Sequence, residues 1–180
     1  MSELVSQTTV IGFSAFSGTG KTTLLKKLIP LLREHKLRLA VIKHAHHDFE
    51  IDHPGKDSFE LRKADAYQVL ISSSKRKALI TEFEEDEPEP ELQELIDELD
   101  HQKLDLILVE GFKREHFSKI ELHRKVMHKP FLFERDKDII ALVSDTLLEQ
   151  NKNLPNLDIN NPQEIANFIL QLVQNKKNST

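Results

Sequence analysis

The 180-residue sequence contains no cysteine. That absence excludes disulfide scaffolds, cysteine-ligated zinc, iron–sulfur clusters and thiol catalysis. Long apolar runs are also missing, because the longest have four or five residues, whereas about 20 are needed to cross a bilayer. The polar segment Met1–Thr9 lacks the charged and apolar regions of a signal peptide. We therefore expect a cytoplasmic protein with no membrane partner.

The sequence also lacks any stripe of lysine and arginine interleaved with aromatic residues, so it does not indicate a nucleic-acid partner. The formal net charge is −5, and residues 81–100 contain eleven acids and no lysine or arginine. The remainder of the chain is therefore mildly basic, which suits a phosphate-bearing small molecule. We interpret the acidic stretch Glu82–Asp100 as a solvated surface and assign it no functional role.

Short apolar segments rich in β-branched residues alternate with segments of helical periodicity. Strands are expected at Thr8–Ser14, Arg38–Lys43, Ala66–Ser72, Lys77–Glu82, Leu104–Glu110, Ser118–Arg124 and Ile139–Ser144. Helices are expected at Thr22–His35, Asp57–Asp65, Pro88–Asp100 and from Pro162 onward, with Asn161 as the last N-cap. This order predicts an α/β protein with the three-layer phosphate-loop NTPase fold, a mostly parallel sheet with helices on both faces, in a single domain over residues 1–180.

Two of these elements carry a further expectation. Pro30 removes one backbone hydrogen bond inside the first helix, so we expect a kink or an early end there. Ser118–Arg124 alternates between polar and apolar residues and is expected nearer an edge of the sheet than the continuous apolar run Leu104–Glu110.

The most informative segment is SAFSGTGKTT, residues 14–23, between the first strand and the first helix. It matches the phosphate loop G-x-x-x-x-G-K-[ST] except that Ala15 replaces the first glycine. In such a loop the backbone amides of residues 17–23 converge on phosphate oxygens, aided by the helix N-terminus. Lys21 brings a positive charge to the β- and γ-phosphates, and the Thr22 hydroxyl is a ligand for Mg²⁺. The nucleotide-binding residues predicted here are Ser17, Gly18, Thr19, Gly20, Lys21, Thr22 and Thr23.

A second feature is Glu110, at the end of the most apolar strand and followed by Gly111. Phosphate-loop proteins place an acid, usually aspartate, at such a strand end to hold Mg²⁺ directly or through water. No glutamine follows in residues 112–116 that would orient an attacking water. The sequence therefore indicates slow hydrolysis rather than fast turnover.

A third cluster, residues 43–58, follows the second strand and is rich in lysine, histidine and aspartate. It is expected at the carboxyl edge of the sheet, where ligands bind in α/β folds. The loop is better suited to bind an anionic second ligand, or to supply the remaining Mg²⁺ ligands, than to form a dedicated transition-metal site. The reason is that the histidine spacing has no regular ligand pattern. Asp48, Asp52 and Asp57 are the Mg²⁺ candidates, with Asp48 favoured, and Lys56 and Arg62 are candidates for meeting phosphate. The candidate second-ligand residues are Lys43, His44, His46, His47, Asp52, Lys56, Asp57 and Arg62.

A fourth, weaker feature is Ser144-Asp145 at the end of the last strand. A carboxylate there can accept two hydrogen bonds from guanine, which adenine cannot provide. A helix N-cap for Thr146–Gln150 explains the same pair equally well. The residues alone therefore do not decide between GTP and ATP.

Four segments stand in order between about Val10 and Asp145: FSGTGKTTLLKKLIP, IKHAHHDFEIDHPGKDSFELRKADA, KLDLILVEGFK and IALVSD. Together they resemble the molybdopterin-guanine dinucleotide biosynthesis protein B (MobB) family. The resemblance implies a dimeric, GTP-binding accessory protein that uses Mg²⁺ and assists a guanylyltransferase partner in joining GMP to molybdopterin. It further implies that Ser17–Thr23 hold the phosphates, that Glu110 neighbours Mg²⁺, and that the loop His44–Ser58 lies at the active edge, with direct molybdopterin binding left open. Weak GTPase activity is expected beside the adapter role.

Two alternatives use the same phosphate loop. A small-molecule kinase would need an arginine-rich lid, for which Lys75-Arg76-Lys77 is a faint candidate. A nickel-delivery GTPase is suggested by the histidines of the second motif.

Overall fold

A computed structural model describes residues 8–45, 49–83, 88–100, 103–146 and 154–179. The chain divides into two compact units, one formed by residues 1–44 and 91–180 and the other by residues 45–90. The first unit contains the phosphate loop, and the second is an insertion between two of its elements. A single domain over residues 1–180 stays a prediction.

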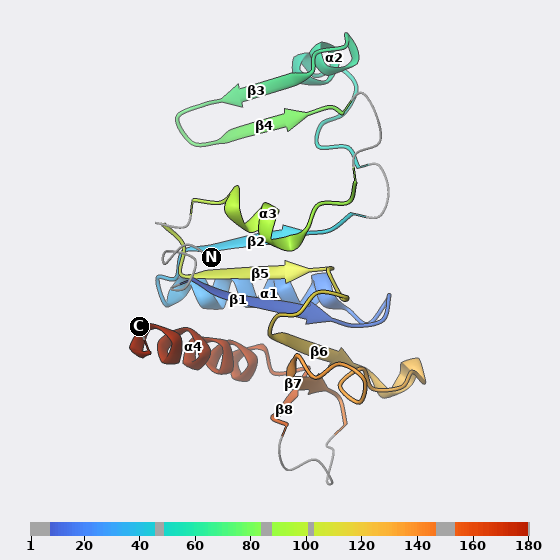
Figure 1. Cartoon of the computed structure of the whole chain (residues 1–180), viewed down its shortest axis with the longest axis vertical. Helices are drawn as coiled ribbons and strands as arrows, with labels where there is room; N and C mark the ends of the chain where they lie inside the picture. The colour runs from blue at the N-terminus through green and yellow to red at the C-terminus, as the bar shows by residue number, and fades with distance from the viewer. Residues whose placement is uncertain (1–7, 46–48, 84–87, 101–102, 147–153, 180) are drawn as a thin grey trace. The chain divides into compact units, whose positions relative to one another are not determined.

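The first unit is built on a six-stranded sheet with the strand order β2-β5-β1-β6-β7-β8 (Figure 1). Every neighbouring pair is parallel, which confirms the expected parallel α/β architecture. The strand β8 was not predicted and lies within the asparagine-rich connection before the last helix. The strands are β1 (Thr9–Ser14), β2 (Leu39–Lys43), β5 (Leu106–Glu110), β6 (Lys119–His123), β7 (Ile139–Ser144) and β8 (Asn156–Asp158).

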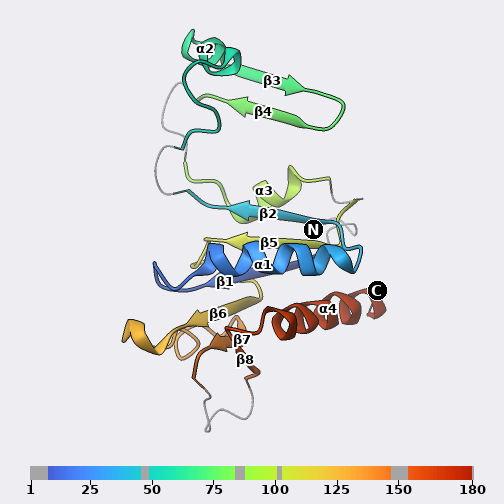
Figure 2. The same cartoon turned by 180° about the vertical axis from the view of Figure 1, so that it is seen from behind.

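One face of this sheet packs against helices α1 (Lys21–Glu34) and α4 (Pro162–Asn178). Seen from behind, α1 runs across β1 and β5 (Figure 2). The early end expected at Pro30 does not occur, because α1 continues to Glu34 with Pro30 exposed on its outer side. Leucines on the inner side of α1 are buried at every helical turn, so packing offsets the lost backbone hydrogen bond. The predicted Asn161 cap is confirmed, since its side chain accepts a hydrogen bond from the Glu164 N–H at 3.3 Å.

The other face is covered by the short helix α3 (Leu92–Asp97) and by two aromatic residues of the segment that follows β5. Phe112 and Phe117 pack there with Ile107 and Val109. Phe117 approaches β1 so closely that a Cβ at Gly12 would lie 2.6 Å from its ring. Helices and this segment together therefore complete a three-layer α/β unit.

Strand β6 lies inside the sheet between β1 and β7, so the expectation that Ser118–Arg124 stands near an edge is wrong. Its polar residues are not turned toward water. Lys119, Glu121 and His123 are at most 7% exposed, and they bind the segment that joins β6 to β7. The alternation that suggests a half-exposed strand thus arises from a buried polar face, which has the same sequence pattern.

Two of these buried groups fix that connecting segment most firmly. The Lys119 ammonium lies 3.1 Å from an Asp136 carboxylate oxygen. The Glu121 carboxylate accepts backbone N–H bonds from Leu132 and Phe133, both at 2.8 Å. Burial raises the pKa of the Glu121 carboxyl above its usual range, although the two N–H bonds act in the opposite direction. The connection between β6 and β7 is therefore tied to the sheet along its length.

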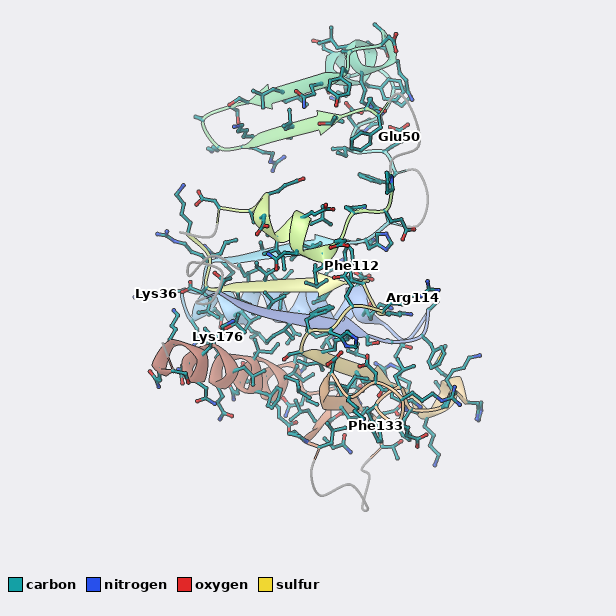
Figure 3. The ribbon with its side chains drawn as sticks, viewed as in Figure 1. Lys36, Glu50, Phe112, Arg114, Phe133 and Lys176 are labelled. Carbon is teal, nitrogen blue, oxygen red and sulfur yellow. The ribbon has the colours of Figure 1, made fainter. Side chains whose placement is uncertain are left out.

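The second unit contains the helix α2 (Asp57–Lys63) and the antiparallel hairpin of β3 (Gln68–Ser72) and β4 (Lys77–Thr81). Its charged centre is Arg62, which is 8% exposed. The Arg62 guanidinium binds Glu50, labelled in Figure 3, together with Asp52 at 3.1 Å and Glu82 at 2.7 Å. The hydrogen bonds that Arg62 donates to Glu82 and Glu50 raise the pKa of Arg62 further above its usual value. Arg62 thereby joins the segments that precede α2 and follow β4.

Candidate nucleotide-binding site

The predicted phosphate loop forms the connection between β1 and α1. Gly18 and Gly20 adopt left-handed backbone angles, with φ of 81° and 102°. Both the backbone N–H and the hydroxyl of Thr19 donate to the Phe16 carbonyl, at 3.3 and 2.8 Å, and close the turn. Ser17 and Gly18 are exposed. The loop is therefore a tight turn whose tip is open to solvent, as a phosphate cradle requires.

The first turn of α1 faces this loop and offers several backbone donors. Its N-cap is Gly20, which has no side chain to cap the first amides, and the first turn contains no acid. The leading N–H groups of a helix have no intrahelical partner. Thr22 and Thr23 are exposed at this end. Together with the positive end of the helix dipole, the uncapped amides favour an anion.

Lys21 supplies the positive charge of the site. Its ammonium lies 3.5 Å from the Ala15 carbonyl oxygen at the end of β1. Burial lowers the pKa of Lys21; the negative charge of Glu110 partly offsets this, and the positive charge of Lys113 lowers it further. An incoming phosphate would compensate this partly desolvated cation.

Glu110 ends β5, the strand that pairs with β1 and β2, and its negative charge acts to raise the pKa of Lys21. The next two residues, Gly111 and Phe112, have φ of 117° and 51°. A Cβ at Gly111 would lie 2.5 Å from the Cβ of His44, so only glycine fits there without displacement. The backbone at Glu110 is thus held close to the end of β2.

A segment that the sequence motifs do not include packs against the phosphate loop. The Arg124 side chain donates from Nε to the Thr19 carbonyl oxygen at 3.2 Å. The Met127 side chain approaches Gly18, where a Cβ would lie 3.6 Å from its methyl carbon. Nothing local in the sequence signals these contacts, because Arg124 and Thr19 are 105 residues apart.

Asp145 holds the same segment from the other side. Its carboxylate accepts the Lys125 N–H at 2.9 Å and lies 3.9 Å from an Arg124 guanidinium nitrogen. Ser144 is buried and bonds to Asn156 of β8 at 3.3 Å. Guanine readout by this pair stays a prediction, and the helix Thr146–Gln150 offered as its alternative lies mostly outside the described residues.

The predicted second-ligand residues are divided between the two units. Lys43 and His44 belong to the first unit, at the end of β2. Asp52, Lys56, Asp57 and Arg62 belong to the second, where the Nη atoms of Arg62 are engaged by carboxylates. His46, His47 and Asp48 lie outside the described residues. Among the residues that are described, no group of three or more histidine, aspartate or glutamate side chains could hold a metal ion.

We expect Arg124→Met to weaken nucleotide binding about tenfold, because the loss of one charge-assisted bond loosens the Thr19 carbonyl and the loop around it. Isothermal titration with Mg²⁺ and GTP measures the effect. Lys125→Met is the matched control, since Lys125 is exposed and contacts Asp145 through its backbone only. Equal losses in the two variants would contradict a specific role for Arg124.

The family model described as molybdopterin guanine dinucleotide synthesis protein B matches residues 10–145. The chain is 49% identical over 166 residues to the molybdopterin-guanine dinucleotide biosynthesis adapter protein of Escherichia coli (strain K12), covering 92% of this chain and 93% of that one. It is 43% identical to the adapter protein of the same name from Haemophilus influenzae, over 91% of this chain and 89% of the relative.

Solved structures agree with the fold. A crystal structure of molybdopterin-guanine biosynthesis protein B superposes with a TM-score of 0.68 at 27% identity, covering 91% of this chain and 99% of the other. A MobB homologue from Bacillus stearothermophilus superposes with a TM-score of 0.67 at 20% identity, over 92% and 98% of the two chains. Within the described residues no helix has the length and apolar character to cross a membrane.

Proposed function

Because the chain belongs to the molybdopterin guanine dinucleotide synthesis protein B family, we propose that it is a GTP-binding adapter that assists the attachment of GMP to molybdopterin. The observation that carries this proposal is the open phosphate loop with its uncapped helix N-terminus and partly desolvated lysine. The names of the relatives supply the biosynthetic context.

The triphosphate would lie against the amides of Ser17–Thr23, with the Lys21 ammonium between the β- and γ-phosphates. Arg124 would hold the loop in shape through the Thr19 carbonyl. The N-terminus of α1 would contribute its dipole to the same phosphates. The chain's own groups thus account for binding and orientation.

Mg²⁺ fits the donors available at this site. The Thr22 hydroxyl stands in the exposed first turn of α1, and the Glu110 carboxylate ends the neighbouring strand β5. Both are oxygen donors, and Mg²⁺ in nucleotide sites usually takes one or two protein oxygens, with phosphates and water completing its octahedral shell. Mg²⁺ would neutralise charge on the terminal phosphates. Of the other Mg²⁺ candidates, Asp52 contacts Arg62 and Asp57 begins α2, both in the second unit, while Asp48 lies outside the described residues.

Guanine selectivity would come from Asp145, whose carboxylate stands beside Arg124 at the end of β7. Hydrolysis would be slow, because the segment after Gly111 offers no glutamine to orient water. The protein would act chiefly by presenting GTP to a guanylyltransferase partner, as a cytoplasmic homodimer. As an adapter, the protein would also be able to contact molybdopterin directly.

Titration of the full-length protein with GTP and with ATP, each with Mg²⁺, tests the proposal. We expect GTP to bind about tenfold more tightly or better, because a carboxylate that pairs with guanine is left unpaired by adenine. Equal or tighter binding of ATP would contradict it. GDP serves as the control for the base, since it keeps the guanine and removes the γ-phosphate.

A further inference from the structure

A hollow of about 370 Å³ lies in the first unit between the segment after β5 and the segment before β7. Its volume is within the range of small-molecule sites. Its lining is mostly cationic and includes Lys113, Arg114, His116, Lys119, Arg135, Asp136, Lys137 and Asp138. Of these residues, only Lys113 lies within a sequence motif described above, as the last residue of KLDLILVEGFK. A hollow of similar size beside α4 has one acid and no lysine or arginine in its lining.

The two acids of the hollow are already engaged. The Lys119 ammonium lies 3.1 Å from Asp136 and 3.7 Å from Asp138, and Asp138 also contacts the His116 ring nitrogen at 2.8 Å. For the other four cations, no ion pair within 4 Å is found among the described residues. The hollow therefore carries a surplus of positive charge that a dianion would offset.

Lys119 also joins the two walls. It is 2% exposed, and its ammonium donates to the Lys113 carbonyl at 3.4 Å while it contacts Asp136 on the opposite side. The Phe117 ring lies 5.1 Å from the same ammonium. The walls are thus held at a fixed separation by a buried group, which reduces the ordering cost of binding.

The hollow adjoins the phosphate site. Its first wall begins at Lys113, three residues after the end of β5 at Glu110, and the positive charge of Lys113 lowers the pKa of Lys21. Arg114 lies at the edge of the sheet toward which β1 and β5 run (Figure 3). An anion bound here would stand beside the phosphate end of a nucleotide rather than beside its base.

We propose that this hollow binds a second small ligand that carries a phosphate monoester. Guanidinium groups from the two walls, Arg114 and Arg135, can each present two donors to the oxygens of such a group. A compact dianion suits a hollow whose cations converge from two segments. An extended acidic peptide would instead require a longer basic surface. The inference goes beyond the proposed function, since it uses none of the nucleotide-binding residues.

The test uses the full chain with its phosphate loop saturated by Mg²⁺ and a non-hydrolysable GTP analogue, titrated with glycerol 3-phosphate. The double variant Arg114→Gln/Arg135→Gln removes one guanidinium from each wall. It should weaken the binding of glycerol 3-phosphate roughly tenfold to a hundredfold. Both residues are exposed, so the fold is retained. The control Lys26→Gln/Lys27→Gln removes the same charge from exposed positions on α1 and should leave binding unchanged. Failure of the wild type to bind, or equal affinity in the arginine variant, would overturn the proposal. Tighter binding of hexaglutamate than of the monoester would also overturn it.

A parallel titration in Lys21→Ala separates this proposal from the nucleotide function. That variant removes the lysine of the phosphate loop but leaves the hollow intact, so the monoester should bind it as it binds the wild type. If the wild type does not bind GTP but binds the monoester, and loses that binding when Arg114 and Arg135 are replaced, only the nucleotide function is refuted. GTP binding without monoester binding would refute only the second site.

Discussion

We expect Lys21→Ala to abolish measurable nucleotide binding while the protein remains folded. The ammonium is the one lysine charge within the phosphate loop, and losing the charge-assisted bonds that we propose it makes to two phosphates should weaken binding roughly a hundredfold or more. The fold loses little, because the Lys21 ammonium makes only a long, 3.5 Å contact with the Ala15 carbonyl. Burial already lowers the pKa of this group, so its removal relieves a desolvated charge.

Isothermal titration with Mg²⁺ and GTP measures the loss, and circular dichroism during thermal unfolding reports the fold. Lys26→Ala, five residues further along α1 and exposed, is the matched control and should retain binding. If Lys21→Ala binds GTP as tightly as the wild type, the proposal that residues 17–23 bind the phosphates of the nucleotide is contradicted.

We expect Gly111→Ala to destabilise the first unit by about 3 kcal/mol, because it combines left-handed backbone strain with overpacking. The φ of 117° is costly for any residue with a Cβ, and that Cβ would lie 2.5 Å from the Cβ of His44. The His44 N–H bonds to the Glu110 carbonyl at 2.9 Å, so the displaced chain also moves the carboxylate expected to neighbour Mg²⁺.

Urea unfolding of Gly20→Ala provides the comparison, because Gly20 has a φ of 102° but no atom within 4 Å of the position that an alanine Cβ would take. Strain alone should cost this variant about 1–2 kcal/mol. If the two alanine variants unfold at the same urea concentration, the close approach of His44 adds nothing to the loss of unfolding free energy in Gly111→Ala.

The elements and residues that depend on local sequence were predictable. The Asn161 cap follows from residues within four positions. The phosphate loop follows from the adjacent motif residues Gly20, Lys21 and Thr22, and its two glycines, Gly18 and Gly20, adopt left-handed angles. Strand β5 follows from an apolar run that only a doubly covered strand explains. In each case neighbouring residues along the chain decide the outcome.

Features that depend on distant partners were not predictable. The alternation of Lys119 and Glu121 indicates partial exposure, but their carboxylate and backbone partners lie 11–17 residues further on. The Arg124 contact with Thr19 likewise depends on tertiary packing alone. The separate hairpin β3–β4 has ordinary strand signals, and nothing in them says that it leaves the main sheet.

The most direct test is a crystal structure of the protein with Mg²⁺ and GTP. Phosphate oxygens should stand within hydrogen-bond distance of the backbone amides of Ser17–Thr23 and of the Lys21 ammonium, with Mg²⁺ on the Thr22 hydroxyl. GTP bound elsewhere on the chain, with those amides facing only water, would contradict the account.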